Sequence, residues 1–234
     1  MQFMIVPSRG ILPLRAFCVI MLALLPALAL SGSGAAAATT YLATPTRSST
    51  LGQFERAWSG VQGYTARITL FEKEGSKVQR AVYTYTFSKP SQATLHVVSG
   101  TSAGDTLKWD GGTTVVASRG SGLLSIIKKK FSLHDPSVTT IRGSSVDQLG
   151  FGAILAHAQS IAGTLRPGTI ATAGGVATQP LTLIPAVGAR DAGYTREVVA
   201  LSTTTHLPVR VLGYDGQTLV REVDFSQVTL QHTA

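Results

Sequence analysis

The side chains that most often carry out hydrolysis are few in this chain, and their spacing matches no known catalytic arrangement. Five histidines are scattered along the sequence, at His96, His134, His157, His206 and His232. Ser121 lies between glycines in "SRGSGLLS", but the G-x-S-x-G spacing that exposes a nucleophilic serine is absent. No base is placed in the sequence to activate this serine. We therefore expect that the protein is not an enzyme.

Motifs for metal ions and nucleotides are also missing. The sequence has no H-E-x-x-H pair, no Cys/His cluster and no dense set of Asp and Glu. His134 and Asp135 are adjacent, but the following Pro136 makes a turn the simpler interpretation. The "GSG" element that begins at Gly120 lacks the strand–loop–helix context of a dinucleotide site. We expect neither a metal ion nor a cofactor.

Charge is the more informative chemical feature. Lys and Arg number 20 against 12 Asp and Glu, but only 14% of the residues are charged. This mild basic excess is not typical of nucleic-acid binding. In "IIKKKF", a strand would place Lys128 and Lys130 on one side and Lys129 on the other. Two interpretations stay open: an exposed edge strand whose lysines oppose aggregation, or a basic rim that meets phosphate head groups.

Residues 1–38 have the plan of a secretory signal peptide. Arg9 and Arg15 precede an apolar run from Ala16 to Leu30, and small residues follow up to Ala38. The run is shorter than the roughly 20 apolar residues that a membrane-spanning helix needs. An uncleaved N-terminal anchor is the alternative interpretation. We expect cleavage and export to the periplasm, with a soluble protein once the peptide is removed.

The only cysteine, Cys18, lies within this apolar run. Cleavage would leave no thiol, which excludes disulfides, thiolate metal sites and a cysteine nucleophile. Residues 39–50, rich in Thr, Ser and Pro, are expected to form a flexible leader. Residues 51–234 are numerous enough to bury a sizeable core, and no repeat or linker divides them, so we expect a single domain.

Two helices are expected from apolar residues at helical spacing. The first is predicted from Leu51, Phe54, Trp58 and Val61, with Thr50 as its N-cap. The second is predicted in "SSVDQLGFGAILAHAQSIAG", which has a broad apolar stripe weakened by two glycines. Gly-rich loops are expected between this helix and "QPLTLIPA".

Most of the remaining sequence alternates apolar and polar residues with the period of two that is typical of strands. Residues Gly63–Phe87 predict a hairpin with one apolar and one polar face, and Asp-Gly pairs at Asp110 and Asp215 predict further turns. Near the C-terminus, one face is expected to carry Tyr194, Arg196, Val198, Val209 and Val211. The sum is a mainly β (α+β) fold, with about eight to eleven antiparallel strands in a curved sheet and two helices on one side.

The order of these segments resembles the outer-membrane lipoprotein carrier (LolA/LolB-like) superfamily, and is nearest to an uncharacterised exported subgroup of it. The matching segments are the first helix, "GYTARITLFE", "YTYTFSKPSQATLHV", "LKWDGGTTVVASRG", the apolar second helix and "LPVRVLGYDGQTLVREVDFSQVTL". Lys89-Pro90 matches a break between strands in that superfamily, and Asp110-Gly111 matches a turn. The resemblance covers residues 51–230. It implies a half-open barrel, made by a strongly curved antiparallel sheet, with the helices as a lid.

The resemblance also implies an activity, which is to hold acyl chains of a lipid or lipidated protein in an apolar concavity for transfer to the outer membrane. The residues expected to line it are Tyr64, Ile68, Leu70, Tyr83, Tyr85, Phe87, Leu149, Phe151, Val209, Val211 and Phe225. The basic residues expected to meet a head group or docking surface are Arg67, Lys128, Lys129 and Lys130, and Arg67 is the candidate for the arginine that gates the lid in those carriers. The second helix is expected to gate entry.

Two further questions stay open in the sequence. The apolar side chains could fill the concavity as an ordinary core, or leave room for a guest. The protein could also act as an envelope sensor or regulatory binding module through a protein partner, instead of as a carrier. An inner- or outer-membrane receptor is an expected partner of a carrier, and nucleic acid is not.

Overall fold

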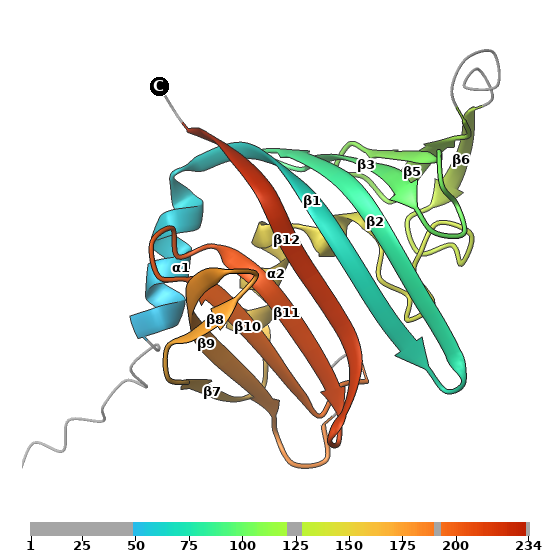
Figure 1. Ribbon diagram of the computed structural model, residues 1–234. Helices are drawn as coiled ribbons and strands as arrows, with labels where there is room; N and C mark the ends of the chain where they lie inside the picture. The colour runs from blue at the N-terminus through green and yellow to red at the C-terminus, as the bar shows by residue number, and fades with distance from the viewer. Residues whose placement is uncertain (1–48, 121–127, 190–192, 233–234) are drawn as a thin grey trace, which may run out of the picture. The chain divides into compact units, whose positions relative to one another are not determined.

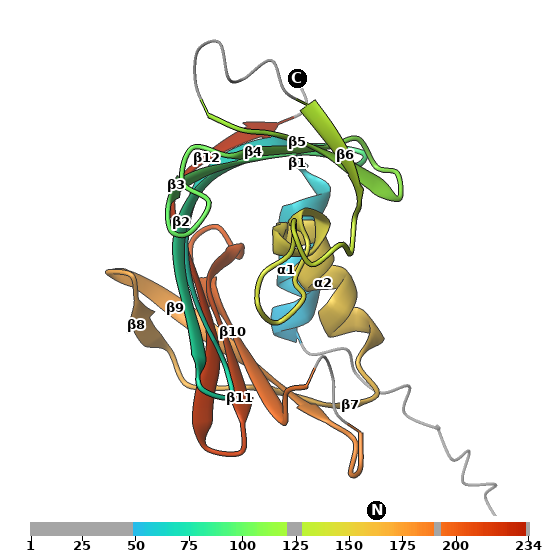
Figure 2. The same ribbon diagram turned by 90° about the vertical axis from the view of Figure 1, so that its right-hand side faces the viewer.

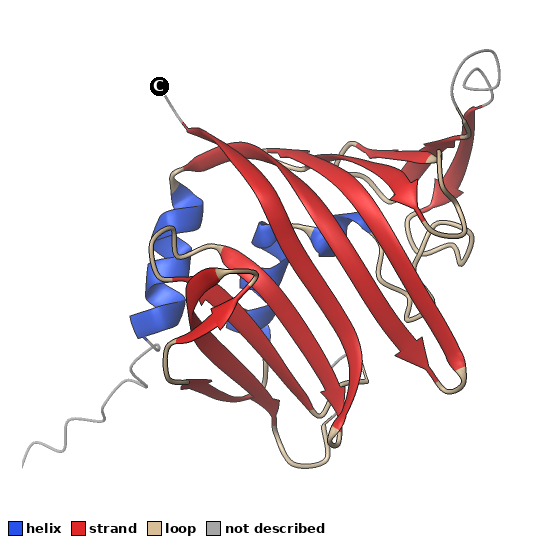
Figure 3. Cartoon of the chain, viewed as in Figure 1, coloured by secondary structure: helices blue, strands red, loops and turns tan. Residues whose placement is uncertain are grey.

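The computed structural model describes residues 49–120, 128–189 and 193–232, which belong to one compact unit, residues 43–234. They form one twelve-stranded antiparallel sheet that does not close, with helices on its concave side (Figures 1 and 3). The predicted fold class is thereby confirmed. The predicted signal peptide lies outside the described residues. Within them, no helix is long and apolar enough to cross a membrane.

The sheet consists of two series of hairpins that join at its middle. Its order is β6-β5-β4-β3-β2-β1-β12-β11-β10-β9-β7, and β8 pairs with β9. The first half contains β1 (Val61–Glu74), β2 (Lys77–Ser88), β3 (Gln92–Ser99), β4 (Thr106–Trp109), β5 (Thr114–Ser118) and β6 (Lys128–Ser132). The second half contains β7 (Gly163–Pro167), β8 (Ala171–Ala173), β9 (Val176–Pro185), β10 (Arg196–Ser202), β11 (Pro208–Asp215) and β12 (Thr218–His232). The strands nearest the two chain ends, β1 and β12, therefore hold the halves together.

The long central strands curve around the helices (Figure 2). β1 and β12 have 14 and 15 residues, and their pairing shifts register between Val61 and Gly63 and again between Thr65 and Arg67. Such bulges bend a strand and increase its twist. The bend turns the apolar face inward, so that β2–β6 form one wall of the concavity and β9–β12 form the other (Figure 2).

The hairpin of β1 and β2 has the predicted alternation. Tyr64 pairs with Phe87 and Ile68 pairs with Tyr83, and all four side chains are buried. The turn at Gly75 has a positive φ of 59°, which glycine adopts without steric penalty. Because the side-chain period of a strand is two, this register commits the whole hairpin to one inward face.

The first helix, α1 (Ser49–Ser59), packs its apolar stripe on the sheet through Leu51 and Phe54. Thr50 lies within this helix and is buried, so the prediction that it is the N-cap is wrong. The C-terminal end is held from the residue that follows β2, because the Lys89 ammonium donates to the carbonyl of Trp58 at 2.8 Å. A cation at this position also interacts favourably with the helix dipole.

The second predicted helix is two helices, η2 (Val146–Leu149, a 3₁₀ turn) and α2 (Phe151–Ser160). Gly150 separates them in an extended conformation, with φ −83° and ψ 154°. The sheet imposes this break, because the Tyr85 hydroxyl donates to the Val146 carbonyl (3.2 Å) and the Phe151 N–H donates to the Tyr64 hydroxyl (3.0 Å). Periodicity alone could not show that two tyrosines would interrupt the helix.

Two strand predictions near the C-terminus also need correction. The inward face of β10 carries Glu197, Val199 and Leu201, and not Arg196 and Val198, which lie on the other face. The alternation of apolar residues predicted the wrong face because Glu197 is a buried charge, and its partner His157 is far away in the sequence. In addition, β7 and β8 form where loops were expected, because both pair with the long strand β9.

Candidate functional site

The centre of the concavity is filled by aromatic side chains. The rings of Tyr64 and Phe151 stack with centroids 4.2 Å apart, and Phe225 meets Phe151 edge-on at 5.0 Å. Trp58 lies 5.6 Å from Phe87 across the same cluster. Close packing of this kind leaves no room for a guest. The middle of the sheet is therefore a packed core.

A cavity of about 370 Å³ lies beside this core, under the first half of the sheet. Its floor is the inward face of β2–β6, formed by Ala81, Tyr83, Leu95, Val97, Leu107, Ala117 and Phe131. Its roof is the segment Ser137–Leu149, which runs from β6 towards α2 and includes η2. Val138, Val146 and Leu149 supply the apolar part of the roof.

The floor follows from strand pairing. Tyr85, Leu95, Leu107, Ala117 and Lys129 form one inward row across β2–β6, each paired with the next. Side chains along a row share a face of the sheet. The aromatic ring of Tyr85 begins the row in the core, and the small Ala117 lies farther out. The decrease in side-chain volume from Tyr85 to Ala117 leaves the space that the cavity occupies.

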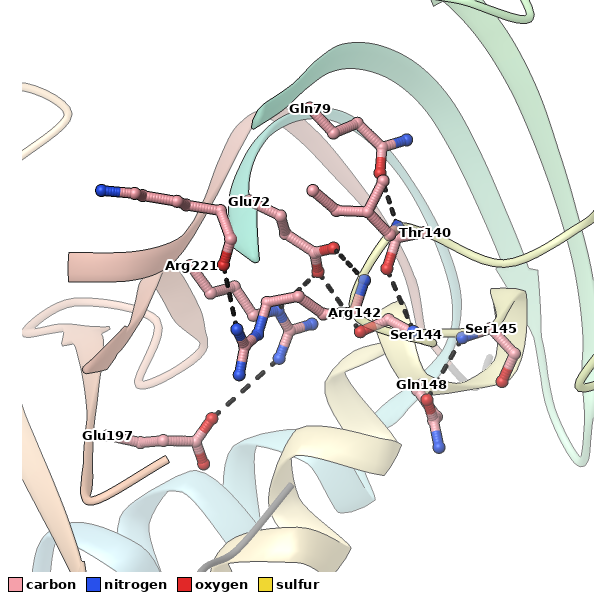
Figure 4. A network of polar contacts seen from close by, with 11 residues as sticks. Glu72, Gln79, Thr140, Arg142, Ser144, Ser145, Gln148, Glu197 and Arg221 are labelled. Atoms are coloured by element: carbon pink, nitrogen blue, oxygen red, sulfur yellow. Dashed lines mark hydrogen bonds and ion pairs between the residues drawn. The ribbon is translucent and has the colours of Figure 1, made fainter. Parts of the chain in front are cut away.

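The roof begins at the turn predicted from Asp135-Pro136, which the structure confirms. The Asp135 carboxylate accepts a hydrogen bond from the Ser137 N–H at 2.8 Å, and this bond lowers the pKa of Asp135. Side chains of the sheet then hold the roof (Figure 4): Gln79 accepts from the Ile141 N–H at 2.8 Å. Arg142 donates to the Lys73 carbonyl at 2.9 Å. Each contact joins the roof to the β1–β2 hairpin.

Glu72 is the centre of this polar network (Figure 4). Its side chain is fully buried, and its carboxylate accepts from the Arg142 N–H (3.2 Å) and the Ser144 hydroxyl (3.4 Å). The Arg221 guanidinium lies 3.6 Å from Glu72 and 4.0 Å from Glu197. A buried carboxylate is tolerated only with such partners, because desolvation of an unpaired charge is expensive.

The network extends to α2 through His157. Its Nε2 lies 2.5 Å from the carboxylate of Glu197 on β10. This contact fixes α2 to the second half of the sheet, while the roof is fixed to the first half. Of the helix predicted as the gate, the α2 part packs against the aromatic core, whereas its η2 part belongs to the roof over the cavity.

The cavity wall carries a neutral phenol at Tyr83. Burial, and secondly the negative charge of Glu72, raise the pKa of Tyr83 to about 12. Burial also raises the pKa of Tyr64 and Tyr85 in the adjacent core. These hydroxyls therefore stay protonated at physiological pH and add no charge to the apolar floor.

The exposed end of the cavity is charged. Lys129 lies there with its ammonium 4.7 Å from the centroid of the Phe131 ring. Arg119 is also at this end, and its Nε lies 3.6 Å from the Asp105 carboxylate. The Arg119 side chain is 83% exposed and that of Asp105 is 25% exposed. The site is thus a cavity with an apolar floor, several serine and threonine side chains in its roof, and a net positive opening.

The structure separates the sequence-predicted ligand residues into three places. Tyr83 and Leu149 line the cavity. Val209 is half-buried outside the main core. The others are buried core residues, namely Tyr64, Ile68, Leu70, Tyr85, Phe87, Phe151, Val211 and Phe225. Contact of any of these residues with a ligand stays a prediction.

The basic residues are also separated. Lys129 lines the cavity, whereas Lys128 and Lys130 lie on the outer face of β6, as strand alternation predicts. Arg67 lies on the outer face of β1, opposite Thr84 and Ser226. A role for Arg67, Lys128 and Lys130 at a head group or docking surface would therefore be exerted from outside the cavity.

Sequence reasoning missed most of the cavity lining, notably Leu95, Val97, Leu107, Ala117 and Val138. The alternation in β3 and β4 could have shown that the first three point inward. It could not show that this end of the concavity stays empty. Within the described residues, no group of three His, Cys, Asp or Glu side chains is placed to hold a metal ion.

Comparison with known proteins finds solved structures of similar fold and no match to a family model or a curated protein. A putative outer membrane lipoprotein-sorting protein domain from Vibrio parahaemolyticus is 14% identical, with a TM-score of 0.40 over 77% of this chain and 92% of that one. A LolA superfamily protein from Nitrosomonas europaea is 9% identical, with a TM-score of 0.38 over 80% and 94%.

A third similar structure is the Mycobacterium tuberculosis lipoprotein LppX, 12% identical with a TM-score of 0.41 over 77% of this chain and 93% of that one. The solved structures similar to this chain thus include one described as a LolA superfamily protein. Identities and TM-scores this low do not identify what the present chain binds.

Proposed function

We propose that this protein is an exported, non-catalytic carrier or chaperone. It holds an acyl chain of a lipid or lipid-modified protein in the cavity between β2–β6 and the roof, for transfer to the outer membrane. The observation that carries the proposal is the cavity of about 370 Å³ with an apolar floor, beside a packed aromatic core. Its volume lies in the range of about 300–1,000 Å³ that is usual for small-molecule sites.

Apolar surface supplies the driving force for binding. Leu95, Val97, Leu107 and Phe131 face the cavity, and a hydrocarbon that covers them removes apolar surface from water. Each buried methylene contributes roughly 0.8 kcal/mol. A reversible carrier needs no covalent step: about ten covered methylenes supply roughly 8 kcal/mol of gross transfer free energy, from which the cost of association is subtracted.

The connection of the roof supports reversible entry. Besides the apolar contacts of Val138, Val146 and Leu149, the roof is linked to the sheet by hydrogen bonds with Gln79, Glu72 and Tyr85. A neutral hydrogen bond contributes about 1 kcal/mol and a bond to the Glu72 carboxylate about 1.5–3 kcal/mol, so each is weaker than the packing of one buried aromatic ring, about 3–5 kcal/mol. We propose that a chain enters and leaves beneath Ser137–Val146 while α2 stays in place.

The first test examines lipid in the protein itself. Protein purified without detergent from envelope extract is extracted with organic solvent and analysed by mass spectrometry. The delipidated protein is then titrated with a fluorescent fatty acid. We expect a co-purifying lipid and saturable binding of the probe. Absence of both would contradict the carrier function.

A pair of variants locates the binding site. Ala117→Trp places an indole in the cavity, and Val116→Trp places the same group on the outer face of the same strand. We expect loss of probe binding in the first variant and unchanged binding in the second, with both proteins folded by circular dichroism. Equal binding by the two variants would place the chain elsewhere.

A further inference from the structure

The two ends of the cavity differ in charge. Its inner end approaches Tyr83 and Gln79, in front of the buried carboxylate of Glu72. Its exposed end carries the cations Lys129 and Arg119 and one carboxylate, Asp105. Because Glu72 is paired with Arg221, the inner end is close to neutral, and an amphiphile inside the cavity meets positive potential at the opening. This polarity favours one orientation, with an anionic head outward.

Lys129 is placed to bind such a head. It is the last member of the inward row that passes through Leu107 and Ala117, so its side chain continues the apolar floor. Its methylene stem can cover apolar surface while its ammonium stays at the opening. The ammonium lies over the Phe131 ring, whose quadrupole keeps it close to the cavity.

Arg119 supplies a second cation on the neighbouring strand end. Its contact with Asp105, at 3.6 Å and largely exposed to solvent, is weak. Its planar guanidinium suits bidentate contact with a carboxylate or a phosphate. Asp105 cancels one positive charge and leaves an excess of one at the opening.

The cavity volume limits the number of chains. A water molecule's share of liquid volume is about 30 Å³, and a methylene is of similar size, so 370 Å³ holds about twelve such groups. This corresponds to one chain of medium length. The adjacent concavity, occupied by Tyr64, Phe151 and Phe225, offers no space for a second chain.

We propose that the cavity selects a single-chain amphiphile with an anionic head, either a carboxylate or a phosphate monoester, and that Lys129 and Arg119 bind this head. The inference rests on the proposed function, because it assigns the ligand class of the same cavity. It adds a preference for charge that burial of a hydrocarbon chain does not require.

The test compares three ligands with the same chain: dodecanoate, dodecyl phosphate and the uncharged dodecanol. Their affinities for the delipidated protein are measured at pH 7.5 by calorimetry or by displacement of a fluorescent probe. We expect at least one anion to bind about three- to tenfold more tightly than dodecanol at low salt, with the preference reduced at 0.5 M NaCl. The anion that is preferred identifies the head group.

Three charge variants locate the effect. Lys129→Gln and Arg119→Gln are each expected to weaken binding of the preferred anion by about threefold and to leave dodecanol unchanged. The matched control is Lys130→Gln, which removes the same charge one residue away on the outer face. We expect the control to bind all three ligands like the wild type.

The outcomes separate this inference from the proposed function. Equal binding of dodecanol and both anions keeps the carrier function but overturns the head-group selection. The same conclusion follows if Lys130→Gln weakens anion binding as much as Lys129→Gln. Failure of all three ligands to bind overturns the acyl-chain cavity itself.

Discussion

The Tyr64 side chain on β1 makes two contacts with Phe151 at the start of α2. The rings are parallel within 6° with centroids 4.2 Å apart, and the Tyr64 hydroxyl accepts the Phe151 N–H at 3.0 Å. Both residues are completely buried. The first N–H groups of a helix have no partner within the helix, so the sheet satisfies one of them. This pair fixes the end of the roof and marks the boundary between core and cavity.

Tyr64→Phe should destabilise the fold without loss of ring stacking. The substitution leaves the buried Phe151 N–H without an acceptor, which costs about 1–3 kcal/mol. Urea denaturation followed by circular dichroism measures the difference. Tyr214→Phe is the control, because its half-buried ring contacts Arg196 and it should change stability by less than about 0.5 kcal/mol. Equal losses in the two variants would refute the role given to the Tyr64 hydroxyl.

Glu72→Ala should be among the most destabilising single substitutions. It removes the carboxylate that binds the roof and leaves the largely buried Arg221 with the longer contact to Glu197, at 4.0 Å, so we expect a loss of about 3–5 kcal/mol. The control is Glu222→Ala, at the residue that follows Arg221. The Glu222 side chain is 29% exposed and lies 3.4 Å from Arg210, so its removal should cost about 1 kcal/mol or less. Chemical denaturation gives the loss of unfolding free energy in each variant. Equal losses would contradict the role of Glu72 as the centre of a buried network.

A coupling measurement tests the pair itself. Combining Glu72→Ala with Arg221→Met should destabilise less than the sum of the two single changes, because neither partner is then left as an unpaired charge. Additive losses would show that the two residues do not interact.

Two glycine-to-alanine substitutions should have opposite effects. A Cβ on Gly213 would lie 2.8 Å from the ring of the buried Tyr194, which also contacts Arg142, so Gly213→Ala should cost about 1–3 kcal/mol. A Cβ on Gly52 in α1 meets only Arg56, at 3.5 Å. Gly52→Ala should therefore stabilise by about 0.5–1 kcal/mol through helix propensity. Thermal unfolding measures whether each variant is stabilised or destabilised. Stabilisation by both variants would contradict the packing at Gly213.

Stability should fall at alkaline pH because of the tyrosines around the cavity. The pKa of Tyr83 is about 12 in the folded protein against 10.0 as its ordinary value. The unfolded chain therefore releases this proton first, and the stabilising contribution is complete below pH 10 and decreases as pH rises towards 12. The two-unit difference corresponds to about 2–3 kcal/mol. Unfolding free energies measured between pH 8 and about 11 should show this decrease, with a smaller slope in Tyr83→Phe.

Phenolate absorbance provides an independent check on that prediction. Burial raises the pKa of Tyr64, Tyr85 and Tyr194 as well, so most buried tyrosines should ionise only as the protein unfolds. Ionisation of these groups near pH 10 in a folded protein would contradict their burial.

The sequence by itself determined the β-rich fold, the inward face of the first hairpin and the opposite directions of Lys129 and Lys130. These features depend on a period of two along one chain, which local alternation expresses directly. The apolar side of β1 and β2 could therefore be read from Tyr64, Ile68 and Tyr83 without any knowledge of their partners.

Only the tertiary structure decided which part of that apolar face encloses space. The same pattern describes Tyr64, which packs against Phe151, and Tyr83, which faces the cavity. The difference arises from residues distant in sequence. Gly150 allows α2 to approach the centre of the sheet, and the small side chain of Ala117 leaves space above the outer part of the floor. Cavity position depends on the volumes of facing side chains, and those become neighbours only when the sheet bends.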